Sequence, residues 1–216
     1  MNNLICLLFL IPCVAFAQHS FLRAPPQREL TKKEHALMEK EYALWEKHNQ
    51  CFNNHKYSAK QRSNFFPFNE ASVVKLVSFA FDPRDYTDIF SAVAINHFIV
   101  NSDKIIEEKV LSKKGIDSLT DILYNIGKTP VGKLQAAAVA EIKCYAPRNA
   151  ILFINSEGVV TQYIKLCFGC QKYYFSSRKI RSMEYCEQKY DLLKALFLTQ
   201  GIQYGTVLPK NEINGN

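Results

Sequence analysis

The residues best suited to chemistry in the body of this sequence are five cysteines: Cys51, Cys144, Cys167, Cys170 and Cys186. Two of them bracket Phe168 and Gly169 in a CxxC motif. If those two residues form a two-residue hairpin loop, the cysteines face each other with Cβ atoms about 4.5–5.5 Å apart. A relaxed disulfide needs roughly 3.5–4.5 Å. A bridge within the motif would therefore be strained and readily reduced.

Three kinds of chemistry fit these cysteines. The favoured one is structural, as disulfides or buried thiols. Two bridges would leave one cysteine unpaired, and the sequence does not determine which cysteines pair. The second is a zinc knuckle, which needs four ligands. The third is a redox pair, but such pairs sit at a helix N-terminus, whereas this motif lies between strands. No cofactor is predicted otherwise, and the candidates for a disulfide or zinc are Cys144, Cys167, Cys170 and Cys186.

A second candidate site is a basic cluster near the expected start of the last helix. A helix N-terminus attracts anions, and guanidinium groups bind them in bidentate fashion. The sequence therefore suggests an anion site, with a solvated loop as the alternative. Its members are Lys172, Arg178, Lys179 and Arg181.

Motifs of known catalytic chemistry are missing from the sequence. It contains no GxSxG, HExxH, P-loop or GxGxxG pattern. His97 stands alone within an expected strand, and the charged loop 82–88 lacks the alternating oxygens of a calcium loop. We therefore predict no catalytic residue and favour a non-enzymatic protein. A hydrolase of unfamiliar type would show itself as a cleft with convergent polar groups.

Residues 1–17 are typical of a cleavable signal peptide. The run Leu4–Ala17 carries no charge, is shorter than the about 20 residues that span a bilayer, and ends in Ala15-Phe16-Ala17. The alternatives are a lipoprotein anchored at Cys13 and a buried N-terminal element. No later apolar run is long enough for a transmembrane segment in the mature chain. The sequence thus predicts export to a periplasmic or secreted location, with a lipoprotein less favoured.

The net charge of +7 suggests possible partners for an exported protein. Anionic envelope components such as lipopolysaccharide, phospholipid or acidic glycan would attract it, although the charge also fits ordinary solubility. Nucleic acid is a poor partner outside the cell, and no nucleic-acid-binding motif occurs.

The N-terminal part of the mature chain must support these sites. Residues 18–30 are expected to form an extended leader, and Thr31 with Glu34 predicts a capping box at the start of a helix over 31–50. Apolar residues recur at helical spacing along this helix, and we expect them to pack on the domain, with a partner-binding stripe as the alternative. They are Leu37, Met38, Tyr42, Leu44 and Trp45.

Strand-like runs alternate with two further helices. The helix after Ser112 ends at Gly127, and the last helix runs from Ser182 to Gly201 with Cys186 on its apolar face. The expected strands are Val73–Phe81, Ala92–Val100, Ile105–Leu111, Ala137–Cys144 (which could instead be helical), Ala150–Ile154, Val159–Cys167 and Cys170–Ser176. Short turns such as Asn101–Lys104 favour antiparallel pairing. We predict one α+β domain over 31–208, with helices on one face of a twisted sheet, and a frayed tail at 209–216.

Two segments carry a likeness to a known group. The run Cys144–Cys170, the last helix as far as Tyr204-Gly205, and the segment Lys109–Asn125 resemble uncharacterised exported proteins of Bacteroidota. The resemblance covers mainly residues 109–205 and implies an envelope or secreted location in a bacterium, without any catalytic residue. The sequence thus predicts a binding or interaction module of the cell envelope. The alternative is a metal- or thiol-dependent protein that uses the four candidate cysteines.

Overall fold

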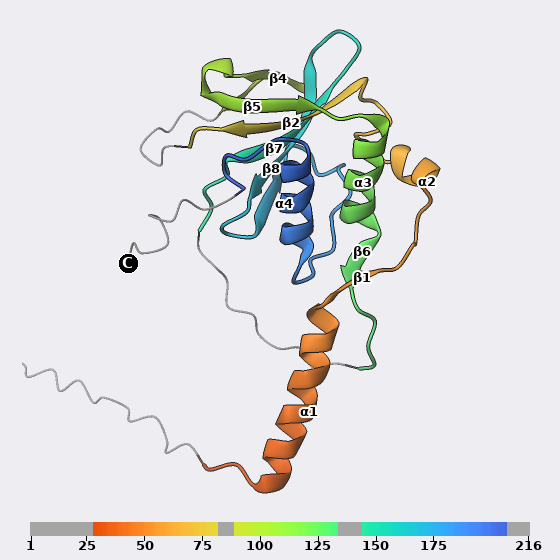
Figure 1. Cartoon of the computed structure of the whole chain (residues 1–216), viewed down its shortest axis with the longest axis vertical. Coiled ribbons are helices and arrows are strands. Elements are labelled where there is room, and N and C mark those ends of the chain that lie inside the picture. Colours follow the sequence, from red (N-terminus) through yellow and green to blue (C-terminus); the bar gives the residue numbers. More distant parts are fainter. Residues whose placement is uncertain (1–27, 82–88, 134–143, 207–216) are drawn as a thin grey trace, which may run out of the picture.

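A computed structural model of the chain describes residues 28–81, 89–133 and 144–206 (Figure 1). Several predicted features lie outside these residues: the signal peptide 1–17, most of the leader 18–30, the charged loop 82–88, residues 137–143 of the expected strand, and the tail 209–216.

The described residues form four α-helices, nine strands and one short 3₁₀ helix. The helices are α1 (Lys32–Asn49), α2 (Ala59–Ser63), α3 (Lys113–Tyr124) and α4 (Lys189–Thr199), and the 3₁₀ helix is η1 (Ser102–Lys104). The strands are β1 (Cys51–Asn53), β2 (Val73–Phe79), β3 (Phe90–Ala94), β4 (His97–Val100), β5 (Ile105–Val110), β6 (Ile126–Lys128), β7 (Asn149–Ile154), β8 (Val160–Cys167) and β9 (Lys172–Phe175).

Seven of the strands form one antiparallel sheet, in the order β3-β4-β8-β7-β2-β5 with β9 also paired to β8. The strands β7 and β8 lie at its centre and form the hairpin that the sequence predicts. Their turn is closed by Asn155, whose side-chain oxygen accepts hydrogen bonds from the backbone N–H groups of Glu157 and Val159. Gly158 adopts a φ of 80°, which glycine tolerates without strain. The predicted α+β class is confirmed.

The main core lies between this sheet and the helices α3 and α4, which cover one of its faces (Figure 1). Alternate residues of the central strands, such as Ile151, Phe153 and Ile164, point into it, and α4 contributes Leu193 and Phe197. A second, smaller cluster on the opposite side includes Val77, Phe79, Phe90, Leu152 and Tyr163. Both faces of the central strands are therefore buried, which explains their nearly continuous apolar sequence.

Two predicted strands are organised differently. The run Ala92–Val100 is not one strand but most of the β3–β4 hairpin, because the chain reverses at Asn96 with a φ of 56°. The segment Asn101–Lys104 is not a hairpin turn, since it contains η1 and the next strand, β5, pairs with β2 instead of β4. The order of the strands in the sheet is set by these longer-range pairings.

Two helix boundaries also differ from the prediction. Ser112 caps α3 as expected, but the helix ends before Gly127, because the residues Ile126–Lys128 pair with β1 as the strand β6. The last helix begins at Lys189 instead of Ser182. Cys186 therefore precedes α4, and its expected position on the apolar face of a helix is wrong. A disulfide from Cys186 to Cys51 instead holds this segment against β1.

The helix α1 begins with the predicted capping box of Thr31 and Glu34, but it does not pack on the core. None of its residues is buried, and Leu37, Met38 and Tyr42 are more than half exposed. The expected core packing of its apolar stripe is wrong, because α1 leads into β1, which pairs with β6 beyond the end of α3 and not with the main sheet. The helix projects away from the domain (Figure 1). Within the described ranges, no helix combines the length and apolarity needed to cross a bilayer.

Candidate functional site

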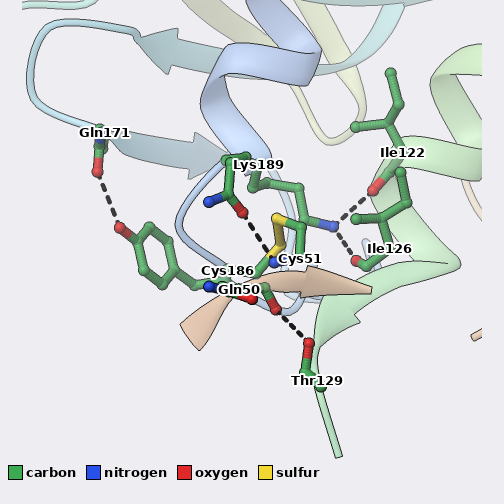
Figure 2. Close-up of a disulfide and its surroundings, with 10 residues drawn as sticks. Gln50, Cys51, Ile122, Ile126, Thr129, Gln171, Cys186 and Lys189 are labelled. Atoms are coloured by element: carbon green, nitrogen blue, oxygen red, sulfur yellow. Dashed lines mark hydrogen bonds between the residues drawn. A yellow bond between two sulfur atoms is a disulfide. The ribbon is translucent and has the colours of Figure 1, made fainter. Parts of the chain in front are cut away.

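The candidate site lies where the C-terminal end of α1 meets residues 185–188, the segment that leads into α4. A disulfide between Cys51 and Cys186 joins the two, with Cα atoms 5.0 Å apart (Figure 2). Next to it, the backbone N–H of Glu187 donates to the carbonyl of Asn49 at 2.7 Å. The backbone N–H of Cys51 donates to the side-chain oxygen of Gln188 at 2.9 Å. One covalent bond and two hydrogen bonds therefore hold these segments at a fixed spacing.

Thr129, the residue that follows β6, supports the same junction. The Thr129 hydroxyl donates to the Gln50 carbonyl at 2.9 Å (Figure 2), and the Nδ1 atom of His48 lies 2.9 Å from the Thr129 carbonyl. The end of α1 is thus tied to β6 as well as to the segment 185–188.

A cleft of about 650 Å³ opens at this junction, within the size range of small-ligand sites. We call it the aromatic cleft. Its residues are Tyr42, Trp45, Glu46, Asn49 and Gln50 from α1 and its end, Lys128 from β6, and Tyr185, Glu187 and Gln188.

Three aromatic rings give the cleft its apolar surface. Tyr42 and Trp45 lie three residues apart on α1, so they project from the same side of the helix. Their rings stack with centroids 6.0 Å apart and an interplanar angle of 24°. Tyr185 comes from the other wall, and its hydroxyl donates to the side-chain oxygen of Gln171 at 2.9 Å, which fixes the ring. Each ring therefore has a contact within the protein that orients it: the stack for Tyr42 and Trp45, and the hydrogen bond for Tyr185.

Carboxylates dominate the charge around these rings. Glu46 lies beside the Tyr42 hydroxyl, and its negative charge is the largest cause of the raised pKa of Tyr42, with a smaller contribution from Glu187. The pKa of Tyr185 is also raised, mainly by burial and then by the charge of Glu187. Lys128 is the one basic residue among those that line the cleft. The local field is therefore negative although the chain as a whole is positive.

A buried lysine anchors the segment 185–188 to α3. The Lys189 side chain is 0% exposed, and its ammonium donates hydrogen bonds to the carbonyls of Ile122, at 2.6 Å, and Ile126 (Figure 2). It thereby satisfies carbonyls at the C-terminal end of α3, where a positive charge is favourable. The pKa of Lys189 is lowered to about 8, and burial of the ammonium is the largest cause.

This lysine makes stability depend on pH. Its pKa is about 8 in the folded chain against 10.5 in its ordinary state, so the unfolded chain binds more protons between these values. The free energy of unfolding should therefore rise by about 2 kcal/mol between pH 7 and pH 10. Above pH 10 it should fall, because burial raises the pKa values of Tyr124 and Tyr190 and only the unfolded chain then ionises them.

Urea unfolding at successive pH values measures this profile, with Cys167 replaced by Ala so that its thiol cannot exchange with a disulfide. The same series on Lys189→Met provides the control, in which the rise toward pH 10 should disappear. A rise that persists in that variant would assign the pH dependence to other groups.

The cysteines form two bridges and leave one thiol, as the structural interpretation expects. The bridges are Cys51–Cys186 and Cys144–Cys170, and Cys167 is free and buried. The expected facing pair in the CxxC motif is wrong, since Cys167 pairs with Lys172 in the β8–β9 ladder and Phe168–Gln171 forms the turn. The backbone N–H of Cys170 donates to the Cys167 sulfur at 3.3 Å.

The four sulfurs proposed as zinc ligands do not form a common group. Cys144 is bonded to Cys170 and Cys186 to Cys51, so these atoms lack the thiolate charge that binds zinc. No group of three or more His, Cys, Asp or Glu side chains suited to a metal ion occurs within residues 28–81, 89–133 and 144–206.

The basic cluster is spread over β9 and the loop after it. Arg181 donates to the Tyr57 hydroxyl at 2.9 Å and lies over the ring of Phe65, 4.3 Å from its centroid. Arg178 and Lys179 are exposed, and Lys172 lies on β9. Because α4 begins only at Lys189, its N-terminus does not follow the cluster as expected. Anion binding by Lys172, Arg178, Lys179 and Arg181 stays a prediction.

The aromatic cleft does not follow from the sequence alone. Tyr42 and Trp45 belong to the apolar stripe of α1, which was expected to pack on the core. The usable signal was the pairing of two aromatic residues with Glu46 near the C-terminal end of this helix. The other wall could not be predicted from a local pattern, because a disulfide between cysteines 135 residues apart brings Tyr185 and Glu187 to the cleft.

Comparisons with known proteins add no assignment: no family model, curated protein or solved structure matches the chain.

Proposed function

We propose that this chain is an exported, non-enzymatic binding module of the cell envelope and that the aromatic cleft is its binding site. The observation that carries the proposal is the cleft of about 650 Å³ with aromatic rings on two walls that a disulfide joins. Rings held in place before binding lose little freedom when a ligand arrives, which favours affinity.

Two features support export. Residues 1–17 have the pattern of a signal peptide, and the chain forms two disulfides, which are typical of oxidising compartments. The anionic envelope partner suggested by the net charge of +7 belongs to the same proposal, because electrostatic attraction would bring the module to such a surface.

Binding fits the cleft better than catalysis does. Its lining residues include no Ser, Thr, Cys or His, so they offer no hydroxyl or thiol nucleophile of the serine or cysteine type with an imidazole base. They supply instead three aromatic surfaces and the side-chain amides of Asn49, Gln50 and Gln188, which suit stacking and hydrogen bonding.

Trp45 makes the proposal testable, because it is the only tryptophan in the chain. Its emission should change saturably when a ligand enters the cleft. The probes are choline, chitotriose, tri-lysine and tri-glutamate, which present different charges and surfaces. Tyr42→Ala and Tyr185→Ala should each weaken binding of the active probe by about tenfold, as expected when an aromatic contact is lost.

Tyr204→Ala is the matched control, since Tyr204 is 38% exposed and is absent from the lining of the cleft. It should bind like the wild type. The proposal fails if no probe gives a saturable change, or if the two cleft variants bind as tightly as Tyr204→Ala.

A further inference from the structure

The aromatic rings of the cleft differ from other rings of the protein in the cations that cover them. Elsewhere the protein covers rings with its own basic side chains: Arg181 lies 4.3 Å from the centroid of Phe65, and Lys165 lies 5.0 Å from that of Tyr174. Within the described residues no such cation lies over Tyr42, Trp45 or Tyr185. The cleft thus retains ring faces whose negative potential attracts positive charge.

The carboxylates reinforce this preference. Glu46 and Glu187 line the cleft against the single ammonium of Lys128. Glu46 lies on α1 with the paired rings of Tyr42 and Trp45, and Glu187 lies on the opposite wall with Tyr185. Both charges act on the Tyr42 hydroxyl, that of Glu46 more strongly. An anion entering the cleft would meet two like charges, whereas a cation would meet rings and carboxylates together.

The net charge of the chain limits how many positive charges a ligand of the cleft can carry. The chain carries a net charge of +7, so it repels a polycation at long range. A single positive charge suffers less of this repulsion and still gains the local contacts. A volume of about 650 Å³ easily accommodates a small organic cation.

We propose that the aromatic cleft selects ligands bearing a single organic ammonium group, of the primary or quaternary kind found in small amines and in phospholipid headgroups. This inference rests on the proposed function, since it names the ligand class of the same cleft. Ring faces stabilise the cation through their quadrupoles, Glu46 and Glu187 provide the counter-charge, and the amides of Asn49 and Gln188 can bind polar groups attached to it.

The decisive experiment compares choline with its neutral isostere, in which a tert-butyl group replaces the trimethylammonium group. Both compounds have the same shape, so a difference in affinity measures the effect of charge. Trp45 fluorescence should show choline binding at least tenfold more tightly. The double variant Glu46→Gln/Glu187→Gln should weaken choline binding about tenfold and leave the isostere unchanged. Glu157→Gln, in the distant β7–β8 turn, is the matched control.

Flotation with phosphatidylcholine vesicles distinguishes the two sources of the ammonium group. These vesicles carry no net charge, so electrostatic attraction alone does not hold a protein with a net charge of +7 on their surface. If the protein binds choline and floats with the vesicles, and the double variant does not float, the ligand is the lipid headgroup. If the protein binds choline but does not float with the vesicles, the ligand is a free amine. Either result supports the inference.

Other outcomes overturn the inference. Equal affinity for choline and its isostere, or binding of chitotriose or tri-glutamate but not choline, leaves a binding cleft without cation selectivity. In that case the proposed function stands and the inference alone fails. If none of the probes binds, both fail.

Discussion

Replacing Cys51 and Cys186 together by serine is expected to lower the free energy of unfolding by about 5 kcal/mol. The bridge closes a loop across a sequence separation of 135 residues, and the entropy that a disulfide removes from the unfolded chain grows with loop length. For a domain of this size, the loss corresponds to a fall in melting temperature of about 10–20 °C. It is the largest effect on stability that we expect from any of the substitutions proposed for this protein.

The same variant should also lose the aromatic cleft. Without the bridge, the junction between α1 and residues 185–188 relies on two direct hydrogen bonds, on the hydrogen bonds of Thr129 to the end of α1, and on the short β1–β6 ladder, three residues long in each strand. Isolated pairings of this length are marginal in water. The end of α1 would therefore detach, separating Trp45 from Tyr185. Binding of the active probe should become undetectable even at temperatures where the main sheet remains folded.

Two probes of unfolding check both parts of this prediction. Far-UV circular dichroism follows the helices and the sheet, and Trp45 fluorescence follows the junction. In Cys51→Ser/Cys186→Ser the fluorescence transition should precede the other, whereas the two should coincide in the wild type. Peptide mapping without reduction should first confirm both native pairings, with Cys167 alkylated.

Cys144→Ser/Cys170→Ser is the matched control. Its bridge spans a sequence separation of 26, so about 3.5 kcal/mol of stability should be lost, while ligand binding at the cleft should persist under native conditions. If both double variants lose binding to the same extent, the effect comes from general destabilisation. The Cys51–Cys186 bridge would then not be specific to the cleft.

Local signals predict most of this fold. Thr31 with Glu34 and Ser112 identify helix starts because a cap needs only residues three positions apart. Asn155 and Gly158 identify the central hairpin because the turn depends on their own side-chain and backbone properties. The antiparallel α+β class then follows from short connections between strands.

The candidate site depends on contacts that no local pattern contains. The pairing of Cys51 with Cys186 was one of several arrangements compatible with five cysteines. The start of α4 was misplaced because residues 182–188 have helical spacing of apolar residues, yet tertiary contacts of Cys186 and Glu187 hold the chain in another conformation. Helical periodicity in α1 likewise predicts an apolar stripe but does not show whether that stripe packs on the core, and no residue of α1 is buried.

A second large effect is expected at Arg62, the buried arginine that joins α2 to α3. Its side chain is 7% exposed and forms ion pairs with Asp117 and Asp121 of α3. It also donates to the Tyr57 carbonyl at 2.7 Å and to the Thr120 hydroxyl at 3.3 Å. Arg62→Ala should lower the free energy of unfolding by about 3 kcal/mol, because buried acceptors lose their donor and the space of the side chain is left empty.

The effect should reach β1 through Asp121. Besides its ion pair with Arg62, this carboxylate accepts hydrogen bonds from the side-chain amides of Asn53, in β1, at 3.0 Å and Asn125 at 2.7 Å. Losing the guanidinium would leave Asp121 less firmly placed and would weaken one of the contacts that hold β1 beside α3. Binding at the cleft should therefore weaken only a few-fold, far less than after loss of the Cys51–Cys186 bridge.

Chemical denaturation of further variants tests this assignment. Arg62→Lys keeps the charge but not the planar set of donors, so it should lose about half as much stability as Arg62→Ala. Arg178→Ala removes an exposed arginine and should change stability by less than about 0.5 kcal/mol. A double-mutant cycle with Asp121→Ala should give a coupling energy of about 1 kcal/mol or more, as expected for directly paired groups. If Arg62→Lys were as unstable as Arg62→Ala, the stabilisation would depend on the planar set of donors and not on the charge.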